Sequence, residues 1–137
     1  TARSRGLGDV YKRQVLASMR RTIASLCHSG CSVIVDDLLF KRSYLDDYID
    51  VLDGTDTWFV GVRCNLEVVH AREAKRPGRF PGTATSHFEQ VHQHGVPYDL
   101  EVDTSHQHPK DVAAQIVARL ATPPEAFARE RQLRSQS

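Results

Sequence analysis

The sequence has few cysteines, and their number is odd. The thiols are Cys27, Cys31 and Cys64 in a chain of 137 residues. A disulfide framework or a zinc site uses paired cysteines at short spacings, and no second pair accompanies these three. The count therefore excludes a disulfide-stapled secreted domain and a structural zinc site, and it favours reduced thiols in a cytoplasmic protein.

The sequence also lacks long hydrophobic runs and an excess of charge of one sign. Its longest apolar stretches, such as 33–35 and 58–60, are far shorter than the roughly 18 residues of a membrane-spanning helix. The formal net charge is +1, which gives no electrostatic reason to expect nucleic acid as a partner. We therefore expect a protein that binds neither a membrane nor nucleic acid.

The first residues differ in composition from the rest. Residues 1–14 carry four basic side chains against one acid, a net charge of +3, which leaves −2 for the other 123 residues. This stretch has no apolar core of a secretory signal. We interpret 1–14 as a non-native leader joined to a gene near Val15, 15–121 as one domain, and 122–137 as a loose polar tail.

Apolar residues recur along the domain with the periods of helices and of buried strands. A spacing of three or four residues predicts helices, and short β-branched runs without alternation predict strands that are covered on both faces. The predicted order is helix 15–27, strand 32–36, helix 43–52, strand 57–63, helix 66–76, helix 85–93, strand 99–103 and a last helix from Pro109 to 120. Strands that alternate with helices indicate an α/β fold with a parallel sheet.

Polar side chains follow each predicted strand. They occupy 36–37, 63–65 and 103–106. Ligands of open parallel sheets bind beyond the carboxyl ends of the strands, so we expect these groups to converge on one site. Simple solvation of the strand ends is the alternative interpretation.

Arginines gather at the end of the helix predicted over 66–76. Arg72 and Arg76 are four residues apart and share a helix face, and Arg79 follows in a segment broken by glycine and proline. One guanidinium group can donate two parallel hydrogen bonds to the oxygens of a phosphate. Several of them can neutralise the charge on a phosphoryl group during its transfer. The pattern is equally typical of a solvated face that pairs with Glu67 and Glu73.

Carboxylates and histidines offer further candidates. Asp36 and Asp37 could hold Mg²⁺ through water, position a hydroxyl substrate or cap the next turn. The histidines at 92, 94, 106 and 108 occur in loops without supporting acids, so we expect them to be solvated rather than metal ligands.

Four sequence blocks together resemble a known family. VIVDDLLF, WFVGVRC, AREAKRPGRFPGTA and HGVPYDLEVDTSH, in this order and spacing, resemble the chloramphenicol phosphotransferase family over about residues 15–121. The resemblance implies the P-loop kinase fold, with parallel strands in the order 2-3-1-4-5, and it makes 32–36, 57–63 and 99–103 strands 3, 4 and 5. It also implies transfer of the γ-phosphoryl group of ATP, with Mg²⁺, to a hydroxyl group of chloramphenicol.

The resemblance implies roles for single residues as well. The lid residues that hold the phosphates would be Arg72, Arg76 and Arg79. The residues that line the acceptor and metal region would be Asp36, Asp37 and Phe40. The residues near the nucleotide would be Arg63, Thr104, Ser105 and His106.

The sequence departs from this family at one essential motif. A P-loop kinase needs G-x-x-x-x-G-K-[ST], whose amides and lysine hold the phosphates, and this run does not occur here. The family's catalytic-base aspartate, which follows the second strand, is absent too. We therefore expect the C-terminal portion of a kinase, inactive alone, with strands 1 and 2 of an incomplete sheet missing. Its unpaired strand edges should lower solubility.

Two other interpretations stay open. The chain could be a non-catalytic α/β module whose arginines hold an anionic ligand, or a kinase of this family with another hydroxylated acceptor. The sequence leaves the oligomeric state open.

Overall fold

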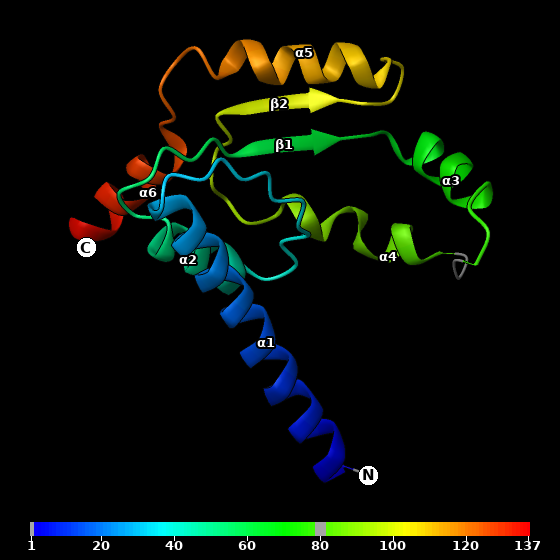
Figure 1. Ribbon diagram of the computed structural model, residues 1–137. Helices are drawn as coiled ribbons and strands as arrows, with labels where there is room; N and C mark the ends of the chain where they lie inside the picture. Colours follow the sequence, from blue (N-terminus) through cyan, green and yellow to red (C-terminus); the bar gives the residue numbers. More distant parts are fainter. Residues whose placement is uncertain (1, 79–81) are drawn as a thin grey trace. The chain divides into compact units, whose positions relative to one another are not determined.

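A long helix begins the chain, which the computed structural model describes over residues 2–78 and 82–137 (Figure 1). This helix, α1 (Ala2–His28), starts earlier than the helix expected from Val15 and runs through the segment interpreted as a leader. The other elements, in chain order, are α2 (Arg42–Val51), β1 (Val60–Arg63), α3 (Leu66–Ala74), α4 (Thr83–Phe88), the 3-10 helix η1 (Gln90–His92), β2 (Leu100–Asp103), α5 (Pro109–Arg119) and α6 (Ala126–Ser135).

The backbone divides into two compact units. The first unit runs to Asp37 and resumes over Ser43–Thr55, so that it contains α1 and most of α2. The second unit consists of Leu38–Arg42 and Asp56–Ser137. In the described ranges of both units, no helix is long and apolar enough to cross a bilayer.

A partly buried ion pair joins α1 to α2 in the first unit. Arg20 is only 4% exposed, and its Nε lies 2.5 Å from Oδ2 of Asp47. The same guanidinium lies 5.0 Å from the ring centroid of Tyr44 and 5.6 Å from that of Tyr48. Because a cation is attracted to the face of an aromatic ring, these rings help to compensate its loss of water.

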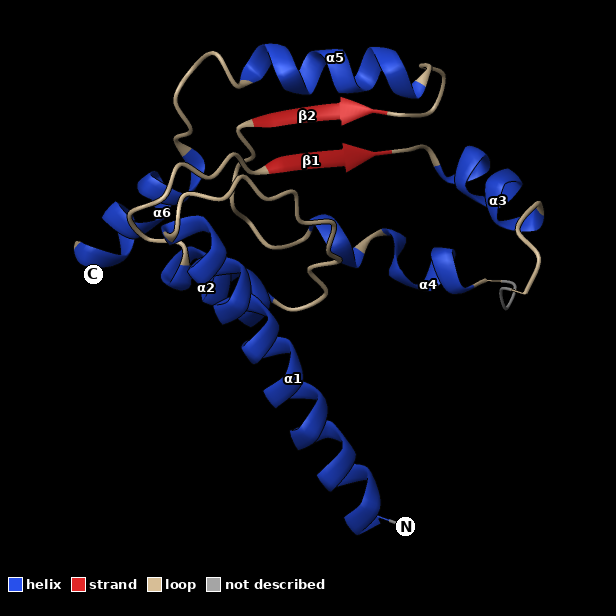
Figure 2. Cartoon of the chain, in the orientation of Figure 1, coloured by secondary structure: helices blue, strands red, loops and turns tan. Residues whose placement is uncertain are grey.

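The two strands of the second unit form a parallel pair (Figure 2). Val60 is in register with Leu100, and Arg63 is in register with Asp103. The connection between the strands contains α3, α4 and η1, and α5 runs alongside β2 (Figure 1). The predicted strands 57–63 and 99–103, which the implied strand order makes neighbours, are therefore paired over their last four residues.

The strand predicted at 32–36 is not formed, and the segment is coil. The strand order implied by the family resemblance places this segment, as strand 3, between strands 2 and 1. The observed strands β1 and β2 correspond to strands 4 and 5 of that order, so neither would lie beside it. A strand needs a neighbour to satisfy its amides and carbonyls, and apolar β-branched residues do not replace that partner. Ile34 is accordingly 99% exposed. The described residues form an α/β fold with a two-stranded sheet, which corrects the expectation of three strands.

The C-terminal residues, expected as a loose polar tail, contain α6 and bury Ala126 and Phe127. A carboxylate distant in the sequence holds the start of this helix. Oδ1 of Asp99 accepts hydrogen bonds from the backbone N–H groups of Glu125 at 2.7 Å and of Ala126 at 3.0 Å. An acidic group at a helix N-terminus satisfies its free amides and opposes its dipole.

Asp99 also fixes the sheet and α5. Its Oδ2 accepts a hydrogen bond from the N–H of Phe59 at 2.8 Å, just before β1. Arg119, at the end of α5, donates from Nε to the Asp99 carbonyl oxygen at 3.0 Å and from Nη1 to the carbonyl oxygen of Thr122 at 2.7 Å. The Asp99 side chain is 1% exposed, so these protein groups replace the water that a carboxylate normally binds.

Tyr98, next to this carboxylate, organises two histidines. The N–H of Val96 donates to Nδ1 of His94 at 3.1 Å, so this nitrogen carries no proton and Nε2 donates to the Tyr98 hydroxyl at 2.8 Å. The hydroxyl proton is then directed to Nδ1 of His92 at 2.5 Å. A Cβ atom on Gly61 would lie 2.6 Å from the Tyr98 ring. Because glycine has no side chain, the Tyr98 ring can pack against β1 at this position. Both imidazoles are neutral in this arrangement.

We expect Asp99→Ala to lower the free energy of unfolding by about 3 kcal/mol, because it removes a buried acceptor and leaves three backbone N–H groups without their partner. Asp99→Asn keeps one oxygen and should cost less. Urea unfolding measures both, and amide hydrogen exchange at Glu125 and Ala126 reports the start of α6. Asp56→Ala removes an exposed carboxylate and is the matched control. An unfolding midpoint for Asp99→Ala equal to that of the control would contradict this role.

The histidine pair predicts a fall in stability at mildly acidic pH. Burial lowers the pKa of both His92 and His94 below the ordinary value of 6.5; Arg63 adds to the effect on both, and Arg42 to that on His94. The two histidines therefore bind protons more readily in the unfolded chain than in the folded chain. As a result, the free energy of unfolding decreases as pH falls through and below 6.5. Urea unfolding at several pH values should show a flatter pH dependence in His94→Gln. The exposed His106→Gln should retain the slope of the parent, and equal slopes in both variants would refute the assignment.

Candidate functional site

The carboxyl ends of β1 and β2 bring together a group of polar residues that we name the strand-end cluster: Cys64, Asn65, Arg72, Thr104 and Ser105. Arg72 reaches it from α3 and donates from Nη2 to the Thr104 carbonyl oxygen at 2.5 Å and from Nη1 to Thr104 Oγ1 at 3.2 Å. Nη1 also lies 3.5 Å from the Cys64 sulfur. The convergence of strand-end groups expected from the topology is therefore observed for these residues.

Local hydrogen bonds position the cluster. Asn65 caps α3, because its Oδ1 accepts from the N–H of Val68 at 3.1 Å. The N–H of Asn65 donates to Ser105 Oγ at 2.8 Å, which links the two strand ends. The N–H of Ser105 donates to Asp103 Oδ1 at 2.7 Å, and hydrogen bonds from Ser105 lower the pKa of Asp103. The loop after β2 thus has a defined conformation beside α3.

The other predicted nucleotide residues point elsewhere or into solvent. The Arg63 side chain forms an ion pair with Glu101 at 2.9 Å, and this bond is the main cause that raises the pKa of Arg63. His106 is exposed in the loop after β2. Arg63 therefore shares the strand end through its backbone, since its carbonyl oxygen accepts from the N–H of Thr104 at 2.8 Å, and not through its guanidinium.

The three predicted lid arginines have different places. Arg72 belongs to the strand-end cluster, and its side chain keeps exposed surface. Arg76 lies just beyond α3 and is exposed, and Arg79 lies outside the described residues. The Glu73 carboxylate accepts hydrogen bonds from the N–H groups of Gly82 at 3.3 Å and Ala84 at 3.0 Å, around the start of α4.

The predicted carboxylates Asp36 and Asp37 belong to the first unit and are exposed. Asp37 accepts a hydrogen bond from the Tyr48 hydroxyl at 2.8 Å. Burial and this carboxylate raise the pKa of Tyr48. Across the described residues, no three His, Cys, Asp or Glu side chains are grouped as a complete set of metal ligands.

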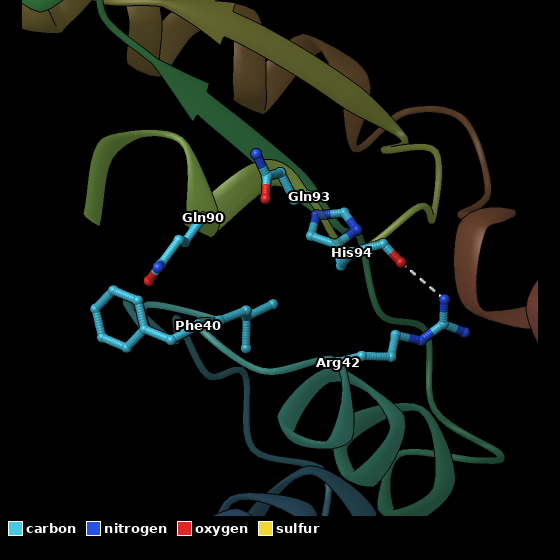
Figure 3. Close-up of a pocket in the computed structure, with 6 residues that line it drawn as sticks. Phe40, Arg42, Gln90, Gln93 and His94 are labelled. Carbon is cyan, nitrogen blue, oxygen red and sulfur yellow. Dashed lines mark hydrogen bonds between the residues drawn. The ribbon is translucent and has the colours of Figure 1, made fainter. Parts of the chain in front are cut away.

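Phe40 lines a cavity of about 320 Å³ in the second unit (Figure 3). The other lining residues are Leu39, Arg42, Gln90, Gln93 and His94. Figure 3 shows Phe40 beside the Gln90 side chain, with His94 and Arg42 toward the other end. Of these six residues, only Phe40 was predicted from the sequence to line a site. The other residues carry no local signature, because loop 38–42 and the segment around η1 meet only in the folded chain.

Arg42 does not offer a free charge to this cavity. Its Nη1 donates to the His94 carbonyl oxygen at 2.8 Å, and its Nη2 forms an ion pair with Glu130 of α6. The cavity wall at this end is thus joined to the helix that Asp99 holds in place. A guanidinium with both contacts made is a structural cation rather than a ready anion-binding group.

Comparison with known proteins agrees with the resemblance of the four blocks. The chain matches the family described as "Chloramphenicol phosphotransferase-like protein" over residues 4–121. Two Mycobacterium tuberculosis proteins, named "Putative O-phosphotransferase MT2714" (strain CDC 1551 / Oshkosh) and "Putative O-phosphotransferase Rv2636" (strain ATCC 25618 / H37Rv), are each 34% identical over 88 residues. These residues make up 64% of this chain and 39% of each relative, so the match spans well under half the length of the relatives. Since the family match extends over most of its residues, the chain belongs to the chloramphenicol phosphotransferase-like family.

Proposed function

We propose that this chain is part of an ATP-dependent O-phosphotransferase that acts on a hydroxylated small molecule. In this reaction the acceptor hydroxyl oxygen forms a bond to the γ-phosphorus of ATP. The bond between that phosphorus and the β–γ bridging oxygen breaks, and ADP and the hydroxyl proton are released. The family match and the names of the two mycobacterial relatives support this class of reaction.

The observation that carries the proposal is the placement of Arg72 at the strand ends. Its guanidinium is held by both oxygens of Thr104 and still has exposed surface. A positioned guanidinium with remaining N–H donors suits the oxygens of a triphosphate, which bind at this edge of a parallel sheet. Arg76 is exposed one turn further along and would add a second cation. We propose that Thr104, Ser105 and His106 border the nucleotide from the loop after β2.

Mg²⁺ fits the chemistry of the exposed carboxylates. This ion keeps several waters and is bound by one or two carboxylates together with substrate phosphates, so it does not require a full cage of protein ligands. Asp36 and Asp37 supply oxygen ligands of the preferred kind. When bound, the ion would neutralise charge on the β- and γ-phosphates.

The phosphate-binding motif of P-loop kinases does not occur in these 137 residues. We propose that a further segment of the protein supplies the motif, completes a P-loop kinase-like sheet and places a strand beside β1. On this proposal the present chain does not transfer phosphate alone. It contributes the arginines, the loop after β2 and part of the acceptor site.

A first test of this proposal uses a protein that is extended upstream, through its own coding sequence, until it includes the phosphate-binding motif. We expect this extended protein to phosphorylate chloramphenicol with [γ-³²P]ATP, and we expect the present chain to give no product. In the extended protein, Arg76→Ala should lower kcat/KM by about ten-fold or more, because it removes a charge-assisted contact to the phosphates. Transfer of label to the acceptor is the measurement.

Lys75→Ala is the matched control, since it removes the adjacent exposed positive charge and should change kcat/KM little. A non-catalytic module that holds an anionic ligand is the rival function, because the same arginines would serve it. An extended protein that binds ATP but transfers no label to chloramphenicol or to other hydroxylated compounds would favour that rival and overturn the proposal.

A further inference from the structure

Three hydrogen bonds of the second unit form a chain in which every link already holds its proton. The N–H of Val96 donates to Nδ1 of His94 at 3.1 Å, and Nε2 of His94 donates to the Tyr98 hydroxyl at 2.8 Å. That hydroxyl donates to Nδ1 of His92 at 2.5 Å. A further proton on either imidazole therefore places two donors against each other.

The two rings differ in how they can take up such a proton. His92 faces a hydroxyl group, which can rotate about its C–O bond and turn its own proton away. His94 faces a backbone N–H, whose direction changes only when the backbone moves. Val96 is 3% exposed and His94 is 7% exposed, so water does not replace the lost acceptor in the folded turn. His94 is therefore the ring whose protonation requires a change of the backbone.

The turn formed by residues 94–97, which we name the His94 turn, can move at Gly95. This glycine has a φ of 77°, in the left-handed region that glycine adopts readily. The hydrogen bond from Val96 to Nδ1 of His94 closes a ring of atoms that includes the His94 carbonyl group. Once this bond is lost, the peptide plane between His94 and Gly95 can rotate, and the carbonyl oxygen rotates with it.

The same carbonyl oxygen holds Arg42 (Figure 3). Nη1 of Arg42 donates to it at 2.8 Å, and Nη2 forms an ion pair with Glu130 of α6. All these residues belong to the second unit. Rotation of the His94 carbonyl therefore removes one of the two contacts through which Arg42 connects the His94 turn to α6.

The surroundings of His94 favour protonation of an opened turn over protonation of the closed one. Burial is the main cause that lowers the pKa of His94 below 6.5, and neighbouring positive charge adds to it. The titratable and charged groups that face the ring or act on it are His92, Tyr98, Arg42 and Arg63. Glu101 acts in the opposite sense, on His92. In an opened turn the His94 ring reaches water and binds a proton at its ordinary pKa.

We propose that the His94 turn is a proton-operated latch: a proton on Nδ1 of His94 opens the turn and withdraws the carbonyl oxygen from Arg42. The latch is closed at neutral pH and opens in mildly acidic solution while β1 and β2 stay paired. It is a local change of the folded chain, distinct from the loss of global stability, and it does not depend on the proposed phosphotransferase function.

NMR of the 137-residue chain tests the latch between about pH 7.5 and about pH 5, above the range in which most carboxylates titrate. We expect the amide signal of Val96 and the Nε–H signal of Arg42 to move together, with one midpoint below pH 6.5. The Trp58 indole N–H, which donates to the Thr122 carbonyl oxygen, and the amide of Thr104 report the folded unit and should keep their positions.

Three outcomes of this titration would overturn the latch. The first is a Val96 amide that does not move in this range. The second is a Val96 signal that moves while that of Arg42 does not, which would separate the turn from its connection to α6. The third is movement of both signals only together with loss of the Trp58 and Thr104 native signals, which would mean unfolding.

Two asparagine variants then identify the ring that senses the proton. His94→Asn places a carbonyl oxygen, which does not titrate, near the position of Nδ1, so the Val96 and Arg42 signals should no longer depend on pH. His92→Asn is the matched control, because it replaces the other imidazole of the chain and keeps an acceptor for Tyr98. It should retain the titration at Val96. The reverse result would place the sensor at His92 and refute the role of His94.

Arg42→Gln tests the same assignment without changing the turn itself. It removes a positive charge that opposes the proton on His94, and it removes the ion pair with Glu130. The Val96 amide should therefore still titrate, with its midpoint at a higher pH than in the parent chain. A midpoint that is unchanged or lower, or a Val96 amide that no longer titrates, would contradict the latch.

Discussion

The buried carboxylate of Asp99 is the contact on which the second unit depends. One side chain accepts hydrogen bonds from the residue before β1 and from the first turn of α6, and its backbone binds Arg119 at the end of α5. A carboxylate that is 1% exposed is stable only while those donors are present. The sheet, the last two helices and the cavity wall formed by Arg42 therefore belong to one cooperative arrangement, because Arg42 pairs with Glu130 on α6.

The sequence predicted best those elements whose stabilising partners are close in the chain or are implied by the topology. Pro109 occupies the first turn of α5, and the two strands that are neighbours in the implied order pair in parallel. The apolar run at 32–36 has strand composition but no strand beside it, and it is coil. Helix α6 was missed for the opposite reason. Its polar composition resembles a tail, and the group that caps it is 26 residues away, at Asp99.

In the candidate site, too, the features that follow from topology were predicted, and those that depend on contacts between distant segments were not. The expectation that polar residues at strand ends converge was met by Asn65, Thr104 and Ser105, because the carboxyl ends of parallel strands necessarily share an edge. The arginine spacing could not show that Arg72 would bind a carbonyl oxygen and a hydroxyl of Thr104. Arg63 was predicted as a nucleotide-binding residue from its position at a strand end, but its side chain forms an ion pair with Glu101 of β2. Gln90 and Gln93 had no sequence signal, since their relation to Phe40 depends on how two distant segments fold together.

In the proposed phosphotransferase, the charged donor and the uncharged acceptor hydroxyl would need different surroundings. ATP carries several negative charges and needs positioned cations, which the exposed face of Arg72 and the neighbouring Arg76 can provide. The acceptor contributes only a hydroxyl group. A cationic acceptor pocket would also attract inorganic phosphate and nucleotide, which would compete with a neutral substrate. Arg42 pairs with Glu130, and His94 is held uncharged by its contacts with Val96 and Tyr98, so neither residue offers a free positive charge beside Phe40.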